Sequence, residues 1–312
     1  MFDKYEKKLH CMDANKVLKQ FLSHLVPVRV YLFFAKRVFA RSACNNNLSG
    51  SVHSDWDSRI ADVLSAPDNL RIERVADAGK ISGNTITMHN GVKVFAGSYY
   101  GDGMLELLIK NRGVHEPQEE LIFSWVIDTL PENCTMVELG AYWSFYSLSL
   151  LKKRPNAMCW MVEPVKRNLA SGILNFKLNE CNGVFVNAGV GAAPSRFPRV
   201  VSVDALCKDH GIDILDVLHA DIQGQELNML RGAVEMLSNN MVKWLFISTH
   251  SDLLHDGCVK HLSGLGYVIV SSVKMDQSYS YDGLIVAKSP AVQGLDNISI
   301  SLKSRENMEL PC

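Results

Sequence analysis

The sequence of 312 residues lacks several features that mark common protein classes. It contains no apolar run of the length that spans a bilayer, which takes about 20 residues. Its formal net charge is −1, so the charge balance gives no reason to expect nucleic acid as a partner. Its eight cysteines include no Cys-x-x-Cys pair. This argues against a zinc site and predicts buried free thiols in a reducing compartment, with a cytoplasmic protein as the default.

The turn after the first strong strand pattern also lacks the three glycines of a dinucleotide-binding fingerprint. An apolar run at 135–139 leads into Gly140, but Tyr142 and Trp143 follow where a pyrophosphate would need space. S-adenosylmethionine has no pyrophosphate and needs only close approach of the backbone and an acid for its ribose. A second apolar run ends in Glu163, which we predict accepts hydrogen bonds from ribose hydroxyls.

Strand and helix patterns alternate along the chain from residue 135. Strands are predicted at 135–139, 157–162, 183–188, 215–220, 243–248, 266–271 and 283–287. Helices are predicted at 143–153, 165–178, 203–210, 224–237 and 253–264. This alternation predicts an α/β fold with a doubly wound, mostly parallel sheet and helices on both faces. Only a loop joins the last two strands, so we expect an antiparallel hairpin at one edge. A seven-stranded sheet of this kind is the Rossmann-like layout of class I methyltransferases.

Composition divides the chain into three parts. Residues 1–54 are predicted to form a helical extension and linker, and residues 55–288 the main domain. We expect a hairpin at 84–95, because Asn-Gly is a strong turn signal, and helices up to residue 130. Residues 289–312 show no periodicity and are predicted to be a loose tail.

The extension has an unusual charge pattern. Residues 15–54 contain six Lys or Arg and no Asp or Glu, with apolar residues at helical spacing. A basic amphipathic segment of this kind, at 15–41, can lie on an anionic membrane surface as a peripheral anchor or dock on a partner protein. It can equally form a helical cap on the protein's own core.

Four sequence blocks resemble the FkbM-type family of S-adenosylmethionine-dependent methyltransferases over residues 82–288. They are Val137-Glu138-Leu139-Gly140-Ala141, Val162-Glu163-Pro164, Ser202-Val203-Asp204, and His219-Ala220-Asp221-Ile222-Gln223-Gly224-Gln225-Glu226. The last block resembles the family's Lys-x-Asp-x-Glu-Gly-x-Glu and is the most diagnostic, although Gln223 replaces the usual Glu and His219 the usual Lys. Ser144 stands where the family usually has a second glycine. The resemblance implies a class I methyltransferase fold and S-adenosylmethionine as the cofactor.

Ligands of open α/β sheets bind at the carboxyl ends of the strands. We therefore expect the acids and the histidine at the predicted strand ends to converge on one edge of the sheet. The resemblance implies that the first block faces the methionine part of the cofactor, that the end of the third strand borders the adenine, and that the segment before 135 closes over the pocket. The predicted cofactor contacts are Glu119, Glu138, Gly140, Ala141, Glu163, Asn187, Ala188 and Asp221.

Asp221 and His250 are the predicted catalytic residues. In such folds the position of Asp221 is nearest the transferred methyl, where a carboxylate can orient an acceptor hydroxyl, take its proton or bind the ammonium group of the cofactor. A neutral histidine at 250 is a suitable general base, and the alternative is a loop histidine that only makes hydrogen bonds. Asp221, Glu226 and His250 could form an oxygen-rich site for a divalent cation, but no pair of them has a diagnostic ligand spacing, so no metal ligand is assigned and metal dependence stays open.

These observations predict an S-adenosylmethionine-dependent O-methyltransferase that acts on a sugar hydroxyl of a glycan or glycoconjugate. The loops at 98–102 and 278–282 combine Tyr with Asp. This combination suits a sugar, because tyrosine rings stack on its apolar faces and carboxylates accept hydrogen bonds from its hydroxyls. A peptide, lipid or small-metabolite acceptor is the first alternative. A catalytically idle module of a glycan-assembly complex is the second, and the altered turn at 142–144 leaves it open.

Overall fold

The computed structural model describes residues 27–32, 54–296 and 298–304. The basic segment predicted at 15–41 lies almost wholly outside these residues, so its association with a membrane, a partner or the core stays a prediction. Within the described part of the chain, no helix combines the length and the apolar character that crossing a bilayer requires.

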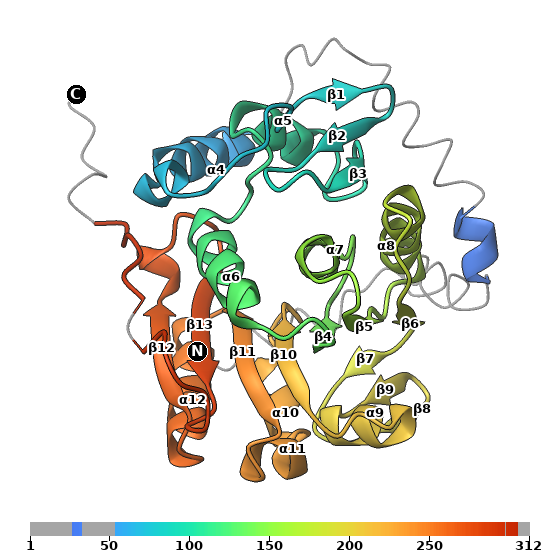
Figure 1. Ribbon diagram of the computed structural model, residues 1–312, viewed down its shortest axis with the longest axis vertical. Coiled ribbons are helices and arrows are strands. Elements are labelled where there is room, and N and C mark those ends of the chain that lie inside the picture. The colour runs from blue at the N-terminus through green and yellow to red at the C-terminus, as the bar shows by residue number, and fades with distance from the viewer. Residues whose placement is uncertain (1–26, 33–53, 297, 305–312) are drawn as a thin grey trace, which may run out of the picture.

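A seven-stranded sheet forms the centre of the fold (Figure 1). Its strands are β4 (Thr135–Leu139), β5 (Met158–Val162), β6 (Val184–Val186), β10 (Leu215–Ala220), β11 (Val242–Thr249), β12 (Val268–Val273) and β13 (Gly283–Lys288). Across the sheet the order is β12-β13-β11-β10-β4-β5-β6, and only β13 pairs antiparallel with its neighbours. This order, with its antiparallel hairpin at one edge, confirms the predicted class I methyltransferase fold.

Helices bury both faces of the sheet, which explains why its central strands are mostly apolar. One face carries α6 (Pro117–Thr129), α7 (Phe145–Lys153) and α8 (Lys166–Leu178). The other carries α9 (Val203–His210), α10 (Glu226–Arg231), α11 (Val234–Ser238) and α12 (Asp252–Gly264). Alternate residues of a strand enter opposite cores: along β4, Met136 packs in the first and Val137 in the second.

A further layer lies outside α6 and α7 in Figure 1. It consists of α4 (Ser54–Ser65), the 3₁₀ turn η1 (Pro67–Leu70), α5 (Asp102–Lys110) and a small sheet of β1 (Ile81–Ser82), β2 (Thr85–Thr87) and β3 (Lys93–Phe95). The antiparallel pairing of β2 with β3 confirms the hairpin predicted from Asn-Gly. Asn175 of α8 and Asn179, the residue that follows α8, form hydrogen bonds with the backbone of β3 and so fix this layer to the methyltransferase fold.

The helix predicted at 224–237 is two helices, α10 and α11, divided at Gly232. A Cβ at position 232 would overlap the backbone of Gly191, so this residue packs directly on the 189–201 segment. The Asp204 carboxylate then accepts the backbone N–H groups of Glu235 (2.9 Å) and Met236 (3.0 Å) in the first turn of α11. The acid of the Ser202-Val203-Asp204 block therefore caps a helix. The same region forms an unpredicted sheet of β7 (Gly189–Val190), β8 (Ser195–Arg196) and β9 (Arg199–Val201).

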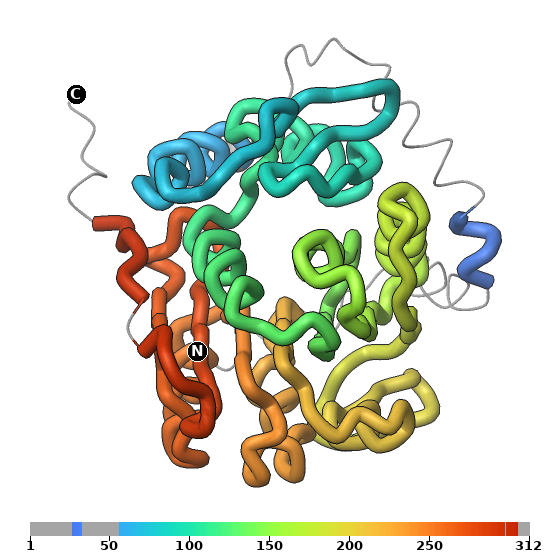
Figure 2. The backbone as a smooth tube through the Cα atoms, in the orientation of Figure 1, coloured from blue at the N-terminus to red at the C-terminus, as the bar shows by residue number. Residues whose placement is uncertain are grey.

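The described part of the C-terminal tail is packed, so the prediction of a loose tail is wrong for residues 289–304. Ser301 donates its N–H to the buried carboxylate of Asp68 (2.8 Å), and the side chain of Gln118 donates to the Ser301 carbonyl (2.6 Å). Lys303 pairs with Asp62 of α4 at 2.7 Å. Figure 2 shows this red end of the chain returning to the blue helix α4. The predicted boundary at 288 itself stays untested.

The cysteines of the described residues confirm the predicted free thiols. Four are buried and one is half-buried: Cys134, Cys159, Cys207 and Cys258, and then Cys181.

Candidate active site

The turn after β4 brings the ends of three strands into contact at Gly140. Its φ is 75°, and a Cβ there would overlap the carbonyl oxygen of Asp221, which directly follows β10. Gly140 donates its N–H to the carbonyl of Val162 at the end of β5 (2.9 Å). A side chain at position 140 would separate these strand ends, so glycine is required both for its backbone angle and for close approach.

The rest of the turn is held in the left-handed region of backbone space. Tyr142 has a φ of 38° and Ser144 a φ of 61°. Non-glycine residues in this region carry about 1–3 kcal/mol of strain each, and such residues concentrate at ligand sites. The turn that departs from the family pattern is therefore a strained turn that the neighbouring elements hold in place.

Glu163 follows β5 and is bound to this same turn. Its carboxylate accepts the N–H of Val165 (2.8 Å) and the N–H of Tyr142 (3.3 Å). Burial raises the pKa of Glu163 to about 7, although these hydrogen bonds act in the opposite direction. The Asn187 side chain donates to the carbonyl of Glu163 (2.9 Å), so two predicted cofactor contacts lie together. Ala188, by contrast, is buried in the apolar core beneath them.

A cavity of about 20 Å³ lies against the turn. Four of the predicted cofactor contacts line it: Glu138, Gly140, Ala141 and Asp221. A single water needs about 10–15 Å³ of such space, so the cavity has room for about one water. The strand ends thus bring half of the eight predicted cofactor contacts together around very little free volume.

Aromatic side chains take up the remaining space. Tyr99 stacks on Trp143, with ring centroids 4.4 Å apart and an interplanar angle of 3°. Tyr100 meets Tyr99 at 4.5 Å and Tyr142 at 5.4 Å. The sequence predicted a sugar-stacking role for the 98–102 loop but not its contact with the 140–144 turn, because the two segments lie far apart along the chain.

A buried network of two histidines and two acids reaches the same cavity through His115 and Glu116. His115 lies 2.7 Å from Glu120 and 3.3 Å from Glu116, and His89 lies 3.1 Å from the other oxygen of Glu120. Tyr146 donates its hydroxyl to Glu116 at 2.8 Å. Burial favours the neutral forms of His115 and Glu116, but their mutual attraction outweighs it. The pKa of His115 rises to about 10, and that of Glu116 falls to about 2.

Glu119 and Glu138 face the first core, beside this network. Glu119 lies 2.8 Å from Nε2 of His219 and also accepts the hydroxyl of Ser248 (3.3 Å). Glu138 accepts the N–H of Ser147 in the first turn of α7 (3.0 Å). Burial raises the pKa of both carboxyls. Glu119 therefore braces β10 and β11 in this structure, and its predicted cofactor contact stays a prediction.

The two predicted catalytic residues lie together on the outer side of the cavity. His250 Nε2 is 3.3 Å from Asp221 and 3.4 Å from Asp282, while Nδ1 is 2.8 Å from the buried Glu226. Burial alone would lower the pKa of His250, but these carboxylates raise it to about 10. The position favours a positive charge, and the role of His250 as a base stays a prediction.

Asp282 is a member of this cluster that sequence analysis placed only in a tyrosine-rich loop. Burial raises its pKa to about 7, and the charge of Asp221 adds to the effect. The one feature of the sequence that could have identified Asp282 as a site residue is its position directly before the last strand, β13. Because β13 runs antiparallel to β11, the start of β13 lies at the same edge as the end of β11.

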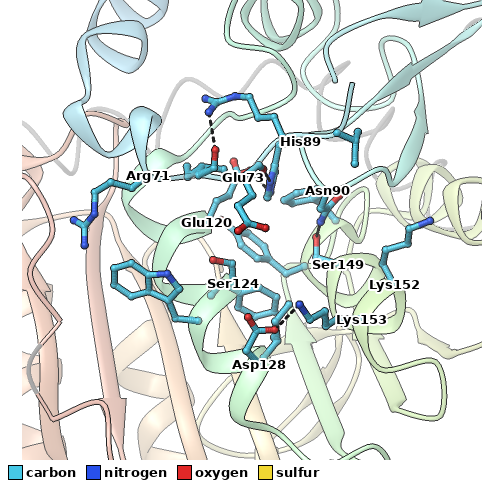
Figure 3. A pocket seen from close by; sticks show the side chains of 18 residues that line it. Arg71, Glu73, His89, Asn90, Glu120, Ser124, Asp128, Ser149, Lys152 and Lys153 are labelled. Carbon is cyan, nitrogen blue, oxygen red and sulfur yellow. Dashed lines mark hydrogen bonds and ion pairs between the residues drawn. The ribbon is translucent and has the colours of Figure 1, made fainter. Parts of the chain in front are cut away.

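A second cavity, of about 400 Å³, lies between α6, α7 and the 71–75 segment (Figure 3). Asn90 donates to Ser149 (2.9 Å) on one side of it, and Lys153 pairs with Asp128 (2.7 Å) on another. Among the described residues that line it there is none of the predicted site residues. Tyr146 lines both cavities.

Comparison with known sequences places the chain near methyltransferases over a short stretch. No family model matches the chain. A putative methyltransferase of Jannaschia sp. (strain CCS1) is 33% identical over 90 residues, which cover 27% of this chain and 32% of that protein. The chain therefore spans about a third of the length of this curated relative.

Solved structures of methyltransferases share low identity with the chain. Methyltransferase FkbM from Methylobacillus flagellatus KT is 21% identical, with a TM-score of 0.41, over 52% of this chain and 45% of that one. A putative SAM-dependent methyltransferase from Streptococcus mutans is 14% identical, with a TM-score of 0.42, over 67% and 56% of the two chains. TrmK of M. capricolum, in complex with S-adenosyl-homocysteine, is 12% identical, with a TM-score of 0.37, over 57% and 74%.

Proposed function

We propose that this chain is an S-adenosylmethionine-dependent O-methyltransferase. The observation that carries the proposal is the meeting of Gly140, Glu163 and Asp221 at the carboxyl ends of β4, β5 and β10, within the strand order of class I methyltransferases. Ligands of open α/β sheets bind at this edge.

The polar groups at this edge fit the cofactor. Gly140 presents backbone without a side chain, Glu163 offers a carboxylate to the ribose, and Glu138 with Asp221 supplies negative charge for the ammonium group. The free volume of about 20 Å³ is far below that of a ligand pocket, about 300–1,000 Å³, so binding requires the Tyr99 and Tyr100 side chains to move outward. When bound, S-adenosylmethionine supplies a methyl group that its sulfonium has already activated for displacement.

The chain's own residues then have to align the acceptor hydroxyl and remove its proton. Asp221 is suited to both tasks because it lines the cavity and its side chain remains 23% exposed on the side of His250. A positioned base typically accelerates such a step by about 10²–10⁴-fold. His250 and Asp282 stand next to Asp221 and set its charge environment.

We further propose a sugar hydroxyl as the acceptor. Tyr100 and Tyr281, 49% and 47% exposed, belong to the two loops that border the cluster, and Arg59 lies 5.0 Å over the ring of Tyr281. Exposed aromatic faces beside carboxylates match a sugar, whose ring faces are apolar and whose edges carry hydroxyls. A small metabolite with a similar hydroxyl is the nearest alternative.

Methyl-labelled S-adenosylmethionine tests this function directly. The full chain is incubated with it and with matched panels of oligosaccharides, sugar nucleotides and peptides, and each product is analysed by mass spectrometry. Label in a sugar at one hydroxyl position is the expected result. Label only in peptides would contradict the acceptor class, and cofactor binding with no transfer to any panel would favour the idle module.

A further inference from the structure

Two carboxylates and one imidazole converge from three neighbouring strands at the edge of the sheet. Asp221 follows β10, His250 follows β11, and Asp282 precedes β13, which lies antiparallel beside β11. One ligand atom from each residue lies within 4.8 Å of the other two. The backbone pairing of Thr249 with Gly283 fixes the last two residues of the cluster side by side.

The distances within this cluster match the spacing of ligands around one cation. Nε2 of His250 is 3.3 Å from Oδ1 of Asp221 and 3.4 Å from Oδ1 of Asp282. Adjacent ligands bonded to an octahedral cation at about 2.1 Å lie about 3 Å apart. A direct ion pair of imidazolium and carboxylate is shorter, about 2.7–2.9 Å. The side chains therefore surround a common centre instead of closing on one another.

Glu226 orients the histidine from behind. It is fully buried, and its Oε1 lies 2.8 Å from Nδ1 of His250, which leaves Nε2 facing the two aspartates. Its other oxygen is buried without a hydrogen-bond partner among the described residues. A metal-binding histidine almost always gives its second nitrogen to a carboxylate or carbonyl in this way. The contact of Glu226 with His250 is separate from the three converging atoms, and it also indicates a metal-binding histidine.

The surroundings favour a positive charge. Three carboxylates, those of Asp221, Glu226 and Asp282, face a single imidazole, and no Lys or Arg of the described chain forms an ion pair with them. Arg59, the cation nearby, lies instead over the rings of Trp56 and Tyr281. The Gln223 amide nitrogen, a hydrogen-bond donor, lies 3.0 Å from Asp221 and 2.7 Å from His250. A hydrogen-bond donor thus already lies between Asp221 and His250, in the space that a cation would take.

We propose that Asp221, His250 and Asp282 bind a divalent metal cation, and that this cation holds the acceptor hydroxyl for methyl transfer. The second half rests on the proposed function. Two carboxylates and one imidazole leave coordination positions open, and carboxylate oxygen is a preferred ligand of Mn²⁺, which makes Mn²⁺ a suitable probe. A bound cation lowers the pKa of a coordinated hydroxyl, and the open positions would let the acceptor bind with its oxygen beside Asp221.

Binding of Mn²⁺ to the full chain tests this site without cofactor or acceptor. Electron paramagnetic resonance of free Mn²⁺, titrated with the protein, should show one binding site per chain. Asp282→Asn should weaken binding at least ten-fold, and Glu226→Gln should weaken it about 10–100-fold through the orientation of His250. Asp256→Asn, which removes an exposed acid paired with Lys274, is the matched control and should leave binding unchanged.

The outcomes separate this proposal from the proposed function. No binding of Mn²⁺ at millimolar concentration, or equal binding by Asp282→Asn in a variant with an unchanged unfolding temperature, overturns the cation site. Binding at the cluster without methyl transfer to any acceptor supports the site and counts against the function. Methyl transfer that is unaffected by a chelator, together with no Mn²⁺ binding, leaves the function standing and refutes the cation.

Discussion

The ring of Tyr99 lies parallel to the indole of Trp143, 4.4 Å away, beside the glycine at which three strand ends meet. This stack closes the space that a cofactor would need. The two residues come from different segments, the 98–102 loop and the 140–144 turn, so we expect the stack to separate when the cofactor binds.

We therefore expect S-adenosylmethionine to change the fluorescence of Trp143 when it binds. Titration of the full chain should give a saturable change in emission, since the indole loses its stacking partner. Trp143→Phe should abolish this change. Trp160→Phe, which alters an indole packed in the core on the other face of the sheet, should retain it. A signal that survives in Trp143→Phe would show that the stack does not open.

Glu163 should make the protein without cofactor less stable as the pH rises. Its pKa in the folded protein is about 7, above its usual value of about 4.5, so the folded state holds the proton more tightly than the unfolded state. Stability is therefore lost between pH 4.5 and pH 7. Glu163→Gln should raise the unfolding temperature at pH 8 and have little effect at pH 4. An equal change at both pH values would contradict the assignment of this pKa.

The network around His115 should also make the folded protein less stable as the pH rises, over a higher range than Glu163. Its pKa in the folded protein is about 10, above the usual 6.5. The stabilisation is complete below pH 6.5 and is lost as the pH rises toward 10. Thermal unfolding from pH 6 to pH 10 should show this loss, and His115→Gln should be less stable than wild type at pH 6 and should lack the same slope. A wild-type unfolding temperature that stays constant up to pH 10 would count against a protonated His115.

Substitutions of His250 and Asp221 should have different effects on cofactor affinity and on the methylation rate. His250→Ala should keep the cofactor affinity and lower the single-turnover methylation rate by about 10²-fold, the lower end of the effect of a lost base, because His250 acts through Asp221. Asp221→Asn should lower both, because Asp221 lines the cavity whereas His250 stands behind it. Normal turnover by His250→Ala, with a loss of rate alone in Asp221→Asn, would assign proton removal to Asp221 by itself.

Local periodicity explains why the sheet could be predicted. Strands that are buried on both faces, such as β10 and β11, are short and mostly apolar, and Gly140 marks the tight turn between strand and helix. Local periodicity does not predict an element whose bounds are set by packing between segments that are distant in the sequence. Nothing in 224–237 shows that Gly232 must meet Gly191, and so the break between α10 and α11 was missed.

The site residues likewise divide into those that local strand patterns could place and those that only long-range pairing places. Asp221 and His250 could be paired because both end parallel strands, which meet at one edge. Asp282 begins a strand, and its place beside them depends on the antiparallel register of β13 with β11, which a sequence does not specify. The contact of His89 with Glu120 likewise depends on packing between distant segments, and the acids in the first turn of α6 do not reveal it.

A calorimetric titration of the full chain with S-adenosylmethionine tests the central claim most directly. Wild type should bind one molecule per chain, and Glu163→Ala should bind about ten-fold or more weakly, because hydrogen bonds to a charged acceptor contribute about 1.5–3 kcal/mol each. Asp209→Ala, which removes an exposed acid at the end of α9, should bind like wild type. No heat of binding by the wild-type chain, or equal affinity in a folded Glu163→Ala variant, would contradict the account.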